Sequence, residues 1–219
     1  ILSDAEGCAR ACGPAIECAD PEALSRIIAH RLHGDPSRSL KLIGITGTNG
    51  KTTTAFILQH LLGLPDAPCG LIGGVFNDDG HERTPAALTT PQGTELSRLL
   101  AAMVDHGCRF AVMEVSSHAL AQGRVDALKF DLGIFTNLSG DHLDFHGSMQ
   151  AYARAKRRLF ELLPSDGLAI VNIDDERGLD MAAAAQCPVI ECGSGATAHV
   201  LCMREDLSGS HARFEGPWG

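Results

Sequence analysis

Short apolar runs alternate along this chain with segments in which apolar residues recur every three or four positions. The runs predict buried strands at Leu42–Thr46, Phe110–Val115, Phe130–Thr136 and Leu168–Ile173. The periodic segments predict helices at Pro21–Leu32, Thr52–Leu62, Thr90–Val104 and Met149–Leu163. Unbroken apolar strands between helices are typical of a parallel sheet covered on both faces. The pattern therefore predicts an α/β fold, a mostly parallel sheet flanked by helices.

Turn-forming and capping residues mark where the predicted elements begin and end. The Gly/Pro/Asp/Ser cluster at positions 33–37 predicts a connection, so we place a domain boundary between 1–39 and 40–219. Thr90 is expected to cap the third helix, with Pro91 at its first helical position. Beyond Cys192 the pattern weakens, and two further short strands are expected at His199–Met203 and Ala212–Glu215.

Net charge, the length of the apolar runs and cysteine spacing exclude several classes of protein. The formal net charge of −9 argues against general nucleic-acid binding, which needs a basic surface, although one local cluster of N–H groups can still hold a nucleotide. The chain has no apolar run of about 20 residues and no basic leader followed by an apolar stretch, which favours a cytoplasmic protein. Its eight cysteines are scattered without a C-x-x-C pair, so reduced thiols are expected in place of a zinc site.

A glycine-rich turn between the first strand and the second helix carries the strongest chemical signal. Its sequence runs Gly47-Thr48-Asn49-Gly50-Lys51-Thr52-Thr53. Glycines let several backbone N–H groups point at one anion, and the helix N-terminus adds its positive dipole end. Lys51 can reach the outer phosphates of a nucleotide, and the Thr52 hydroxyl can bind Mg²⁺. The first glycine of the usual P-loop pattern would fall at Ile45, so the match is incomplete, yet the flanking elements predict a nucleotide-binding loop.

Two polar segments follow predicted strands, Met113–His118 and Thr136–Asp144. Because the carboxyl ends of parallel strands converge on one crevice, Glu114 and His142 are placed to reach a metal near the outer phosphate. Mg²⁺ prefers oxygen ligands, so a histidine ligand is unusual and hints that Mn²⁺ is tolerated. Taken alone, His142 at a strand end is better explained by a structural hydrogen bond.

These segments resemble the Mur ligase family. The resemblance rests on 47–53, on Glu114-Val115-Ser116-Ser117-His118, on Asn137 with Asp141–Asp144, and on Tyr152–Lys156, in that order along the chain. Matching residues are dense over 33–178, and the resemblance is strongest with the members that add the third residue of the peptidoglycan stem peptide. It implies the fold of the central P-loop domain of those ligases.

The resemblance also implies site residues. Lys51 and the turn backbone would bind ATP, and Lys156 would be carbamylated by CO₂, which turns a cation into an anion able to bind metal. Catalytic roles fall to Lys51, Lys156 and His142. The implied metal ligands are Thr52, Glu114, His142 and Lys156. Contacts to the muramoyl dipeptide are implied for Thr89, Thr90, Ser116, Gln122 and Arg124. Without the resemblance, Lys156 would be interpreted as a solvated lysine among Arg154, Arg157 and Arg158.

The implied reaction is ATP-dependent amide-bond formation through an acyl phosphate, with a UDP-muramoyl dipeptide and a free amino acid as substrates. We expect residues 1–39 to be the remnant of a UDP-binding domain, the central domain to be incomplete at its C-terminal end, and a C-terminal ligase domain to be missing. The chain alone is then expected to bind nucleotide weakly and to lack ligase activity. Which amino acid is added, and the oligomeric state, are not fixed by these residues.

Three alternatives stay open. A folylpolyglutamate synthase shares the phosphate loop and a related metal site, but 89–91 and 114–118 fit the muramoyl enzymes better. A plain P-loop nucleotide-binding module would have no use for Lys156. The chain could also be an inactive gene piece.

Overall fold

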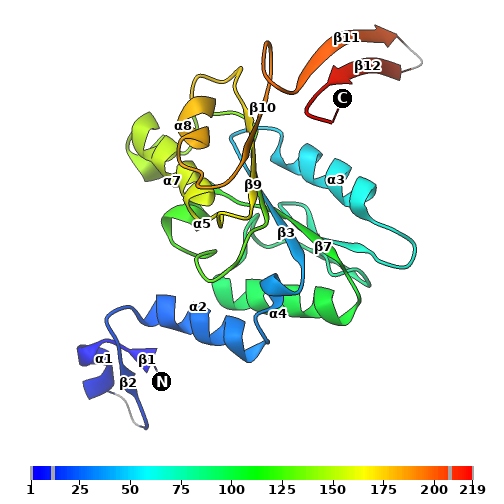
Figure 1. The fold of residues 1–219 in the computed structure, drawn as a ribbon. Coiled ribbons are helices and arrows are strands. Elements are labelled where there is room, and N and C mark those ends of the chain that lie inside the picture. The colour runs from blue at the N-terminus through cyan, green and yellow to red at the C-terminus, as the bar shows by residue number, and fades with distance from the viewer. Residues whose placement is uncertain (1, 11–12, 207–208, 219) are drawn as a thin grey trace.

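An eight-stranded sheet forms the centre of the molecule, in the order β10-β9-β8-β3-β7-β4-β5-β6 (Figure 1). The computed structural model describes residues 2–10, 13–206 and 209–218. The strands are β3 (Lys41–Thr46), β4 (Cys69–Ile72), β5 (Phe76–Asp78), β6 (Arg83–Pro85), β7 (Phe110–Glu114), β8 (Leu132–Phe135), β9 (Leu168–Asn172) and β10 (Val189–Cys192). All neighbours from β10 to β4 are parallel, whereas β5 and β6 add an antiparallel edge. The predicted mostly parallel α/β fold is confirmed.

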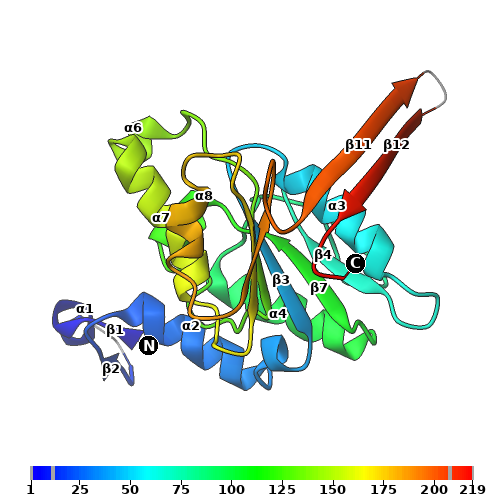
Figure 2. The same ribbon diagram turned by 45° about the horizontal axis from the view of Figure 1, so that its top comes forward.

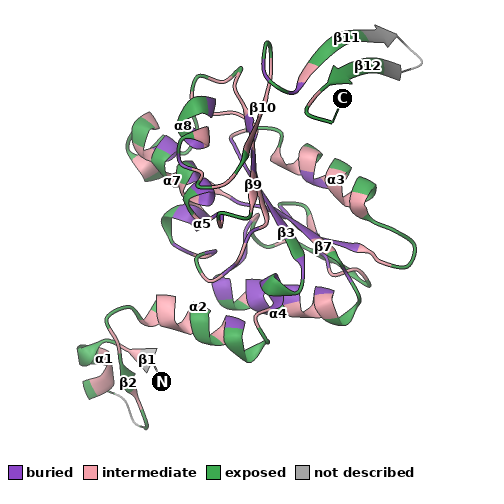
Figure 3. Ribbon diagram, in the orientation of Figure 1, coloured by how far each residue is buried: buried purple, intermediate pink, exposed green. Residues whose placement is uncertain are grey.

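Helices cover both faces of this sheet (Figure 3). One face packs against α3 (Lys51–Leu62) through a core that includes Ile45, Ala55 and Leu71. The other face packs against α4 (Gly93–Asp105), α5 (Ser117–Ala121), α7 (Met149–Glu161) and α8 (Gly178–Ala182). A short helix, α6 (Leu143–His146), precedes α7. Strand β3 lies between β7 and β8, so the loops after all three strands meet at one edge of the sheet.

The two ends of the chain lie outside this sheet. At the start are β1 (Leu2–Ser3), α1 (Ala5–Ala9), β2 (Ile16–Glu17), α2 (Pro21–Leu32) and the 3₁₀ turn η1 (Pro36–Arg38). At the other end, β11 (His199–Asp206) and β12 (Gly209–Glu215) form an antiparallel hairpin that extends from the body on the side of α3 (Figure 2). Both strands expected after Cys192 are therefore present. Cys12 lies outside the described residues, and the other seven cysteines are free thiols.

One predicted helix start is wrong. Helix α4 begins at Gly93, after the residue Gln92, and neither Thr90 nor Pro91 belongs to it. The Thr90 hydroxyl cannot cap the helix because it donates instead to the carbonyl of Glu114 at 2.9 Å and accepts the N–H of Ser116 at 2.9 Å. A long-range contact with the end of β7 thus overrides the local capping signal.

A buried histidine joins α2 to the body of the protein. His30 is 3% exposed, and its ring nitrogens lie 3.3 Å from the Ser97 hydroxyl and 2.8 Å from the Ser37 hydroxyl. Ser97 donates to the carbonyl of Gly93, so its oxygen is left to accept from Nδ1–H of His30. Ser37 accepts the N–H of Lys129 and so donates to Nε2. This network fits a neutral imidazole, and burial lowers the pKa of His30.

Replacing His30 with glutamine is expected to destabilise the chain by about 1–3 kcal/mol at neutral pH, because two buried hydroxyl groups lose their partner. In the unchanged chain, the free energy of unfolding should fall as the pH drops below about 6.5, since the unfolded histidine then takes up a proton that the folded one resists. Urea unfolding at pH 7.5 and 5.5 measures both effects. The exposed His60→Gln variant is the control and should keep the parent pH dependence; an H30Q variant that also keeps it would contradict the assignment.

Candidate functional site

The glycine-rich turn lies at the C-terminal end of β3 and leads directly into α3. Gly50 has a φ of 84°, which favours glycine. A Cβ on Gly47 would lie 1.9 Å from the Thr136 hydroxyl, so only glycine lets the loop after β8 come this close. That loop holds the turn in place, because Asn137 accepts the N–H of Thr48 through its carbonyl at 2.8 Å and the N–H of Asn49 through its side chain at 3.0 Å. Contacts within the chain thus fix the shape of the turn.

Lys51 is folded over this turn. Its ammonium group donates to the carbonyls of Gly47 and Thr48, each at 2.9 Å. Burial lowers the pKa of Lys51, against the opposing effect of the carboxylates of Glu114 and Asp141. The twelve-residue helix α3 begins at Lys51, so its N-terminal end faces the turn as well. A lysine and a helix N-terminus at one glycine turn can together hold a phosphate group.

Glu114 reaches the same place from β7. The residue is 2% exposed, and its carboxylate accepts the Thr52 hydroxyl at 2.8 Å and the N–H of Gly74 at 2.9 Å. A Cβ on Gly73 would lie 2.6 Å from the Glu114 carboxylate, so the pair of glycines after β4 leaves room for it. The predicted convergence of Thr52 and Glu114 is present in the structure.

Lys156 approaches the turn from α7. It is 1% exposed, and its ammonium group donates to the carbonyl of Gly47 at 2.8 Å. The same group lies 4.4 Å from the centre of the Tyr152 ring, one helical turn earlier. Burial, followed by the nearby charge of Lys51, lowers the pKa of Lys156 to about 7, while Asp141 opposes the shift. The interpretation of Lys156 as a solvated lysine is therefore wrong.

His142 lies in a different setting from Glu114. Its φ is 50°, an uncommon value for a residue other than glycine, and its Nε2 lies 3.4 Å from the Asp141 carboxylate. Its ring packs 4.8 Å from that of His118 and 6.3 Å from that of Tyr152. Across the described ranges, no three or more His, Cys, Asp or Glu side chains are gathered as a metal site. A hydrogen bond joins Thr52 to Glu114 directly, whereas the ring of His142 packs against the rings of His118 and Tyr152.

Four of the five residues expected to contact substrate form one hydrogen-bonded chain. Arg124 donates to the Thr90 carbonyl at 2.8 Å and to the Gln122 side chain at 2.8 Å. Thr90 contacts Ser116, which caps α5 by accepting the N–H of Ala119. Thr89 lies on the other side of Thr90, with its hydroxyl 3.2 Å from where a Gly74 Cβ would be. Thr90 is buried and its hydroxyl is occupied, so it orients its neighbours, whereas Thr89, Ser116, Gln122 and Arg124 keep groups for a ligand.

Three residues of this site were given no role of their own from the sequence. Gly74 orients Glu114, Ser139 exchanges hydrogen bonds with Thr48, and Tyr152 both contacts Thr48 at 3.1 Å and lies against Lys156. The Gly73-Gly74 pair directly after an apolar run was the one signal that could have identified a close approach. The other two depend on how α7 and the loop after β8 pack.

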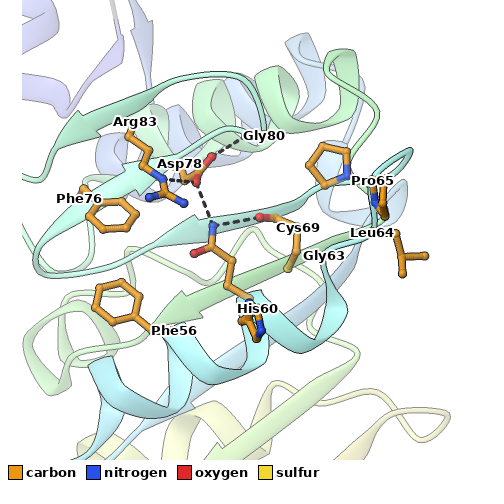
Figure 4. Close-up of a pocket in the computed structure, with 12 residues that line it drawn as sticks. Phe56, His60, Gly63, Leu64, Pro65, Cys69, Phe76, Asp78, Gly80 and Arg83 are labelled. Carbon is orange, nitrogen blue, oxygen red and sulfur yellow. Dashed lines mark hydrogen bonds and ion pairs between the residues drawn. The ribbon is translucent and has the colours of Figure 1, made fainter.

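A separate hollow of about 650 Å³ lies at the other end of α3, beside β5 and β6 (Figure 4). Its carboxylate, Asp78, already accepts from Gln59 at 3.0 Å, Arg83 at 2.8 Å and the N–H of Gly80 at 2.9 Å. Phe56 and Phe76 stack at 5.3 Å to form one wall. These contacts brace the antiparallel edge of the sheet, and none of the predicted site residues lines this hollow.

The β3–turn–α3 unit within a parallel sheet defines a P-loop α/β protein. Comparison with known proteins gives the family: the sequence profile of the Mur ligase middle domain matches residues 45–216. The chain belongs to the Mur ligase family, as the sequence motifs predicted.

Named relatives agree with this assignment. The chain is 48% identical over 163 residues to a UDP-N-acetylmuramoyl-L-alanyl-D-glutamate–2,6-diaminopimelate ligase of Synechococcus elongatus, covering 73% of this chain and 33% of the relative. It is 45% identical over 194 residues to the ligase of that name from Streptomyces coelicolor, covering 87% and 38%. The chain thus spans about a third of the length of these relatives.

Solved structures show the same fold. A structure of a ligase of that name has a TM-score of 0.77 at 27% identity and covers 94% of this chain and 43% of its own. A folylpolyglutamate synthase of Mycobacterium tuberculosis has a TM-score of 0.65 at 20% identity, covering 87% and 51%, and at that identity the likeness concerns the fold alone. None of the helices in the described part of the chain combines the length and apolar character that a membrane crossing requires.

Proposed function

We propose that this chain is the ATP-binding part of a ligase that adds an amino acid to UDP-N-acetylmuramoyl-L-alanyl-D-glutamate. The observation that carries the proposal is the meeting of three distant segments at the glycine turn. The Glu114 carboxylate accepts the Thr52 hydroxyl at 2.8 Å, and Lys156 donates to the Gly47 carbonyl at 2.8 Å. Lys51 donates to the same carbonyl at 2.9 Å. A plain nucleotide-binding module would have no use for a second buried lysine on the turn.

The chemistry that this arrangement suits is phosphoryl transfer to a carboxylate. A carboxylate oxygen of the acceptor attacks the γ-phosphorus of ATP, the bond to the β–γ bridging oxygen breaks, and ADP leaves. The amino group of the incoming amino acid then attacks the carbonyl carbon of the acyl phosphate, inorganic phosphate departs, and the nitrogen loses a proton. The first step brings an anion to a polyanion, so neutralisation and positioning matter more than proton transfer. Lys51, the turn N–H groups and the α3 N-terminus supply positive charge there.

The donor set at the turn fits a magnesium ion. The Thr52 hydroxyl and the Glu114 carboxylate are adjacent oxygen donors beside the phosphate loop. A bound Mg²⁺ would neutralise phosphate charge there. His142 and a carbamylated Lys156 complete the ligand set that we propose, with Mn²⁺ as an alternative ion. Carbamylation requires the neutral amine, which the lowered pKa of Lys156 makes available near pH 7.

We infer the substrates from the names of the relatives and from the hydrogen-bonded residues around α5. We place the muramoyl dipeptide at Thr89, Thr90, Ser116, Gln122 and Arg124. The relatives are named for 2,6-diaminopimelate, so we propose that amino acid as the incoming nucleophile. Because the reaction consumes ATP, we place it in the cytoplasm.

Replacing Glu114 with glutamine tests the nucleotide part of this proposal. Glutamine can still bond Gly74 and Thr52 but has no charge for a cation, so the gain in ATP affinity that Mg²⁺ gives should fall by at least about tenfold, or 1.4 kcal/mol. Fluorescence titration of the chain with a labelled ATP analogue, with and without Mg²⁺, measures that gain. Glu95→Gln, at an exposed carboxylate on α4, is the matched control. An E114Q variant with the parent Mg²⁺ dependence would remove Glu114 from the metal site.

A further inference from the structure

Arg26 on α2 is a largely buried cation with little to balance it. Its side chain is 13% exposed, and its nearest carboxylate, Glu22, lies 3.5 Å away and is itself 87% exposed. No hydrogen bond joins the guanidinium to another residue in the described part of the chain. Guanidinium carries five N–H donors, and removing such a group from water without partners is unfavourable.

The side chain is held where it is by a glycine. A Cβ on Gly93, the first residue of α4, would lie 2.5 Å from Cγ of Arg26 and 2.6 Å from Cδ. The arginine stem therefore passes across the start of α4 in space that any other residue would fill. Its Nη2 ends up 3.4 Å from where a Cβ of Gly123 would be, at the C-terminal end of α5. The stem is thus fixed, while the charged end has only the exposed Glu22 carboxylate within ion-pair distance in the described part of the chain.

The charged end opens into two adjoining hollows of about 760 and 800 Å³. Arg26 and Gln122 line both of them, so the guanidinium and the Gln122 amide lie at their common boundary. Gln122 is exposed and contacts Arg124 through its oxygen, which leaves its N–H₂ group for a ligand.

Three acidic residues line the first hollow, Asp20, Asp126 and Glu161, and none of them forms an ion pair with Arg26 in the described part of the chain. Asp20 caps α2 by accepting the N–H of Ala23. Both oxygens of Asp126 accept from Arg158, at 2.6 and 3.2 Å. Glu161 lies 3.5 Å from Arg157 on the same helix. Arg154 lines this hollow too, and no acidic partner for it is found within the described ranges. Four arginines, Arg26, Arg154, Arg157 and Arg158, thus line this hollow against three carboxylates, which leaves one excess positive charge there in a chain whose net charge is −9.

We propose that Arg26, with Gln122, binds an oxyanion, a phosphate or a carboxylate group, in the cleft between α2 and the C-terminal end of α5. The planar guanidinium matches either group with two parallel hydrogen bonds. Assigning that oxyanion to the acceptor substrate rests on the function proposed above, because Gln122 and Arg124 join this cleft to Thr90 and the end of β7. The site itself rests on the unbalanced arginine. Arg26 is then a determinant of acceptor binding that lies outside the matched middle domain.

Nuclear magnetic resonance of the ¹⁵N-labelled chain tests this site. Two probes are added separately: inorganic pyrophosphate for a phosphate group, and N-acetyl-L-alanyl-D-glutamate for a carboxylate group. Saturable shifts are expected at the Gly93 and Gly123 amides and at the Gln122 side-chain amide with one probe or both, and the responding probe identifies the oxyanion. Arg26→Met keeps an unbranched stem without the charge and should weaken this binding by at least about tenfold. Arg26→Lys should weaken it less, because the charge stays and the fork is lost.

Arg98→Met is the matched control, since it removes an equal charge from an exposed arginine paired with Glu95. It should leave the affinity within about twofold of the parent. The proposal is overturned if neither probe shifts Gly93 and Gly123, or if R98M weakens binding as much as R26M. The glycines of the turn, Gly47 and Gly50, report separately on ATP. A chain that responds to ATP there but to neither probe at Gly93 loses this inference and keeps the proposed function; the opposite result loses the proposed function alone.

Discussion

Lys51→Ala is expected to weaken ATP binding at least about 30-fold, the largest effect on nucleotide affinity that we predict. Truncating one partner of a buried charged pair raises the free energy of binding by about 2–5 kcal/mol, and each 1.4 kcal/mol is a factor of ten. Lys51 is the cation that the turn itself holds, bonded to the Gly47 and Thr48 carbonyls at 2.9 Å. A bound triphosphate would draw this ammonium from two neutral carbonyls to a charged partner.

The readout is fluorescence titration of the chain with a labelled ATP analogue in the presence of Mg²⁺. Lys41→Ala provides the comparison, because it removes a lysine from the far end of the same strand, where the side chain is exposed and paired with Asp131. Thermal unfolding of both variants separates lost affinity from lost fold. If K51A binds the analogue as tightly as the parent chain while remaining folded, the turn does not bind the phosphates.

The elements around the turn could be predicted from the sequence because their signals are local. The expected strand Leu42–Thr46 and helix Thr52–Leu62 differ from β3 and α3 by one residue each at their N-terminal ends. Strands β4, β5, β6 and β10 were not predicted, since runs of three or four residues are too short to carry a periodic signal. Strands β5 and β6 exist because β4 offers β5 an edge to pair with, and no local pattern records that.

In the candidate site, too, one part could be predicted from the sequence and another could not. That Glu114 would meet Thr52 followed from the rule that parallel strands end at one edge, and the two side chains lie 2.8 Å apart. The backbone of His142, with its φ of 50°, follows from how the loop after β8 packs on His118 and Tyr152, which the residues alone do not encode. The approach of Thr52 to Glu114 is therefore the better predicted part of the proposed metal site, and the position of His142 relative to it remains a prediction.

Lys156 shows why a charge pattern can mislead. Three arginines surround it in the sequence, and that pattern favours a solvated helix face. Helix α7 instead turns Tyr152, Lys156, Leu159 and Phe160 toward the protein, and Lys156 ends 1% exposed. A buried ammonium is unfavourable, and its lowered pKa of about 7 expresses that. The neutral amine that this pKa makes available is the form that the proposed carbamylation requires.

Replacing Lys156 with alanine is therefore expected to lower amide formation by about 10²–10³-fold or more in the ligase to which we assign this chain, the effect of removing a group that stabilises transition-state charge. The chain itself offers a direct readout. In ¹³C-bicarbonate, a carbamate carbon signal should appear for the parent chain and be missing for Lys156→Ala and Lys156→Arg, because alanine has no amine and arginine stays protonated. A carbamate nitrogen keeps one N–H, which suffices for the bond to the Gly47 carbonyl.

Lys129→Ala, at a partly exposed lysine near Asp166, should retain both the signal and the activity. Short-chain carboxylic acids should restore part of the activity to K156A, since they return an anion to the space that the side chain leaves, and should do nothing for K156R, whose guanidinium fills it. The direction of that difference is what separates an anionic role for position 156 from a cationic one. Activity retained by K156R and lost by K156A would mean that the turn needs a positive charge at this position, and the proposed carbamate would then be wrong.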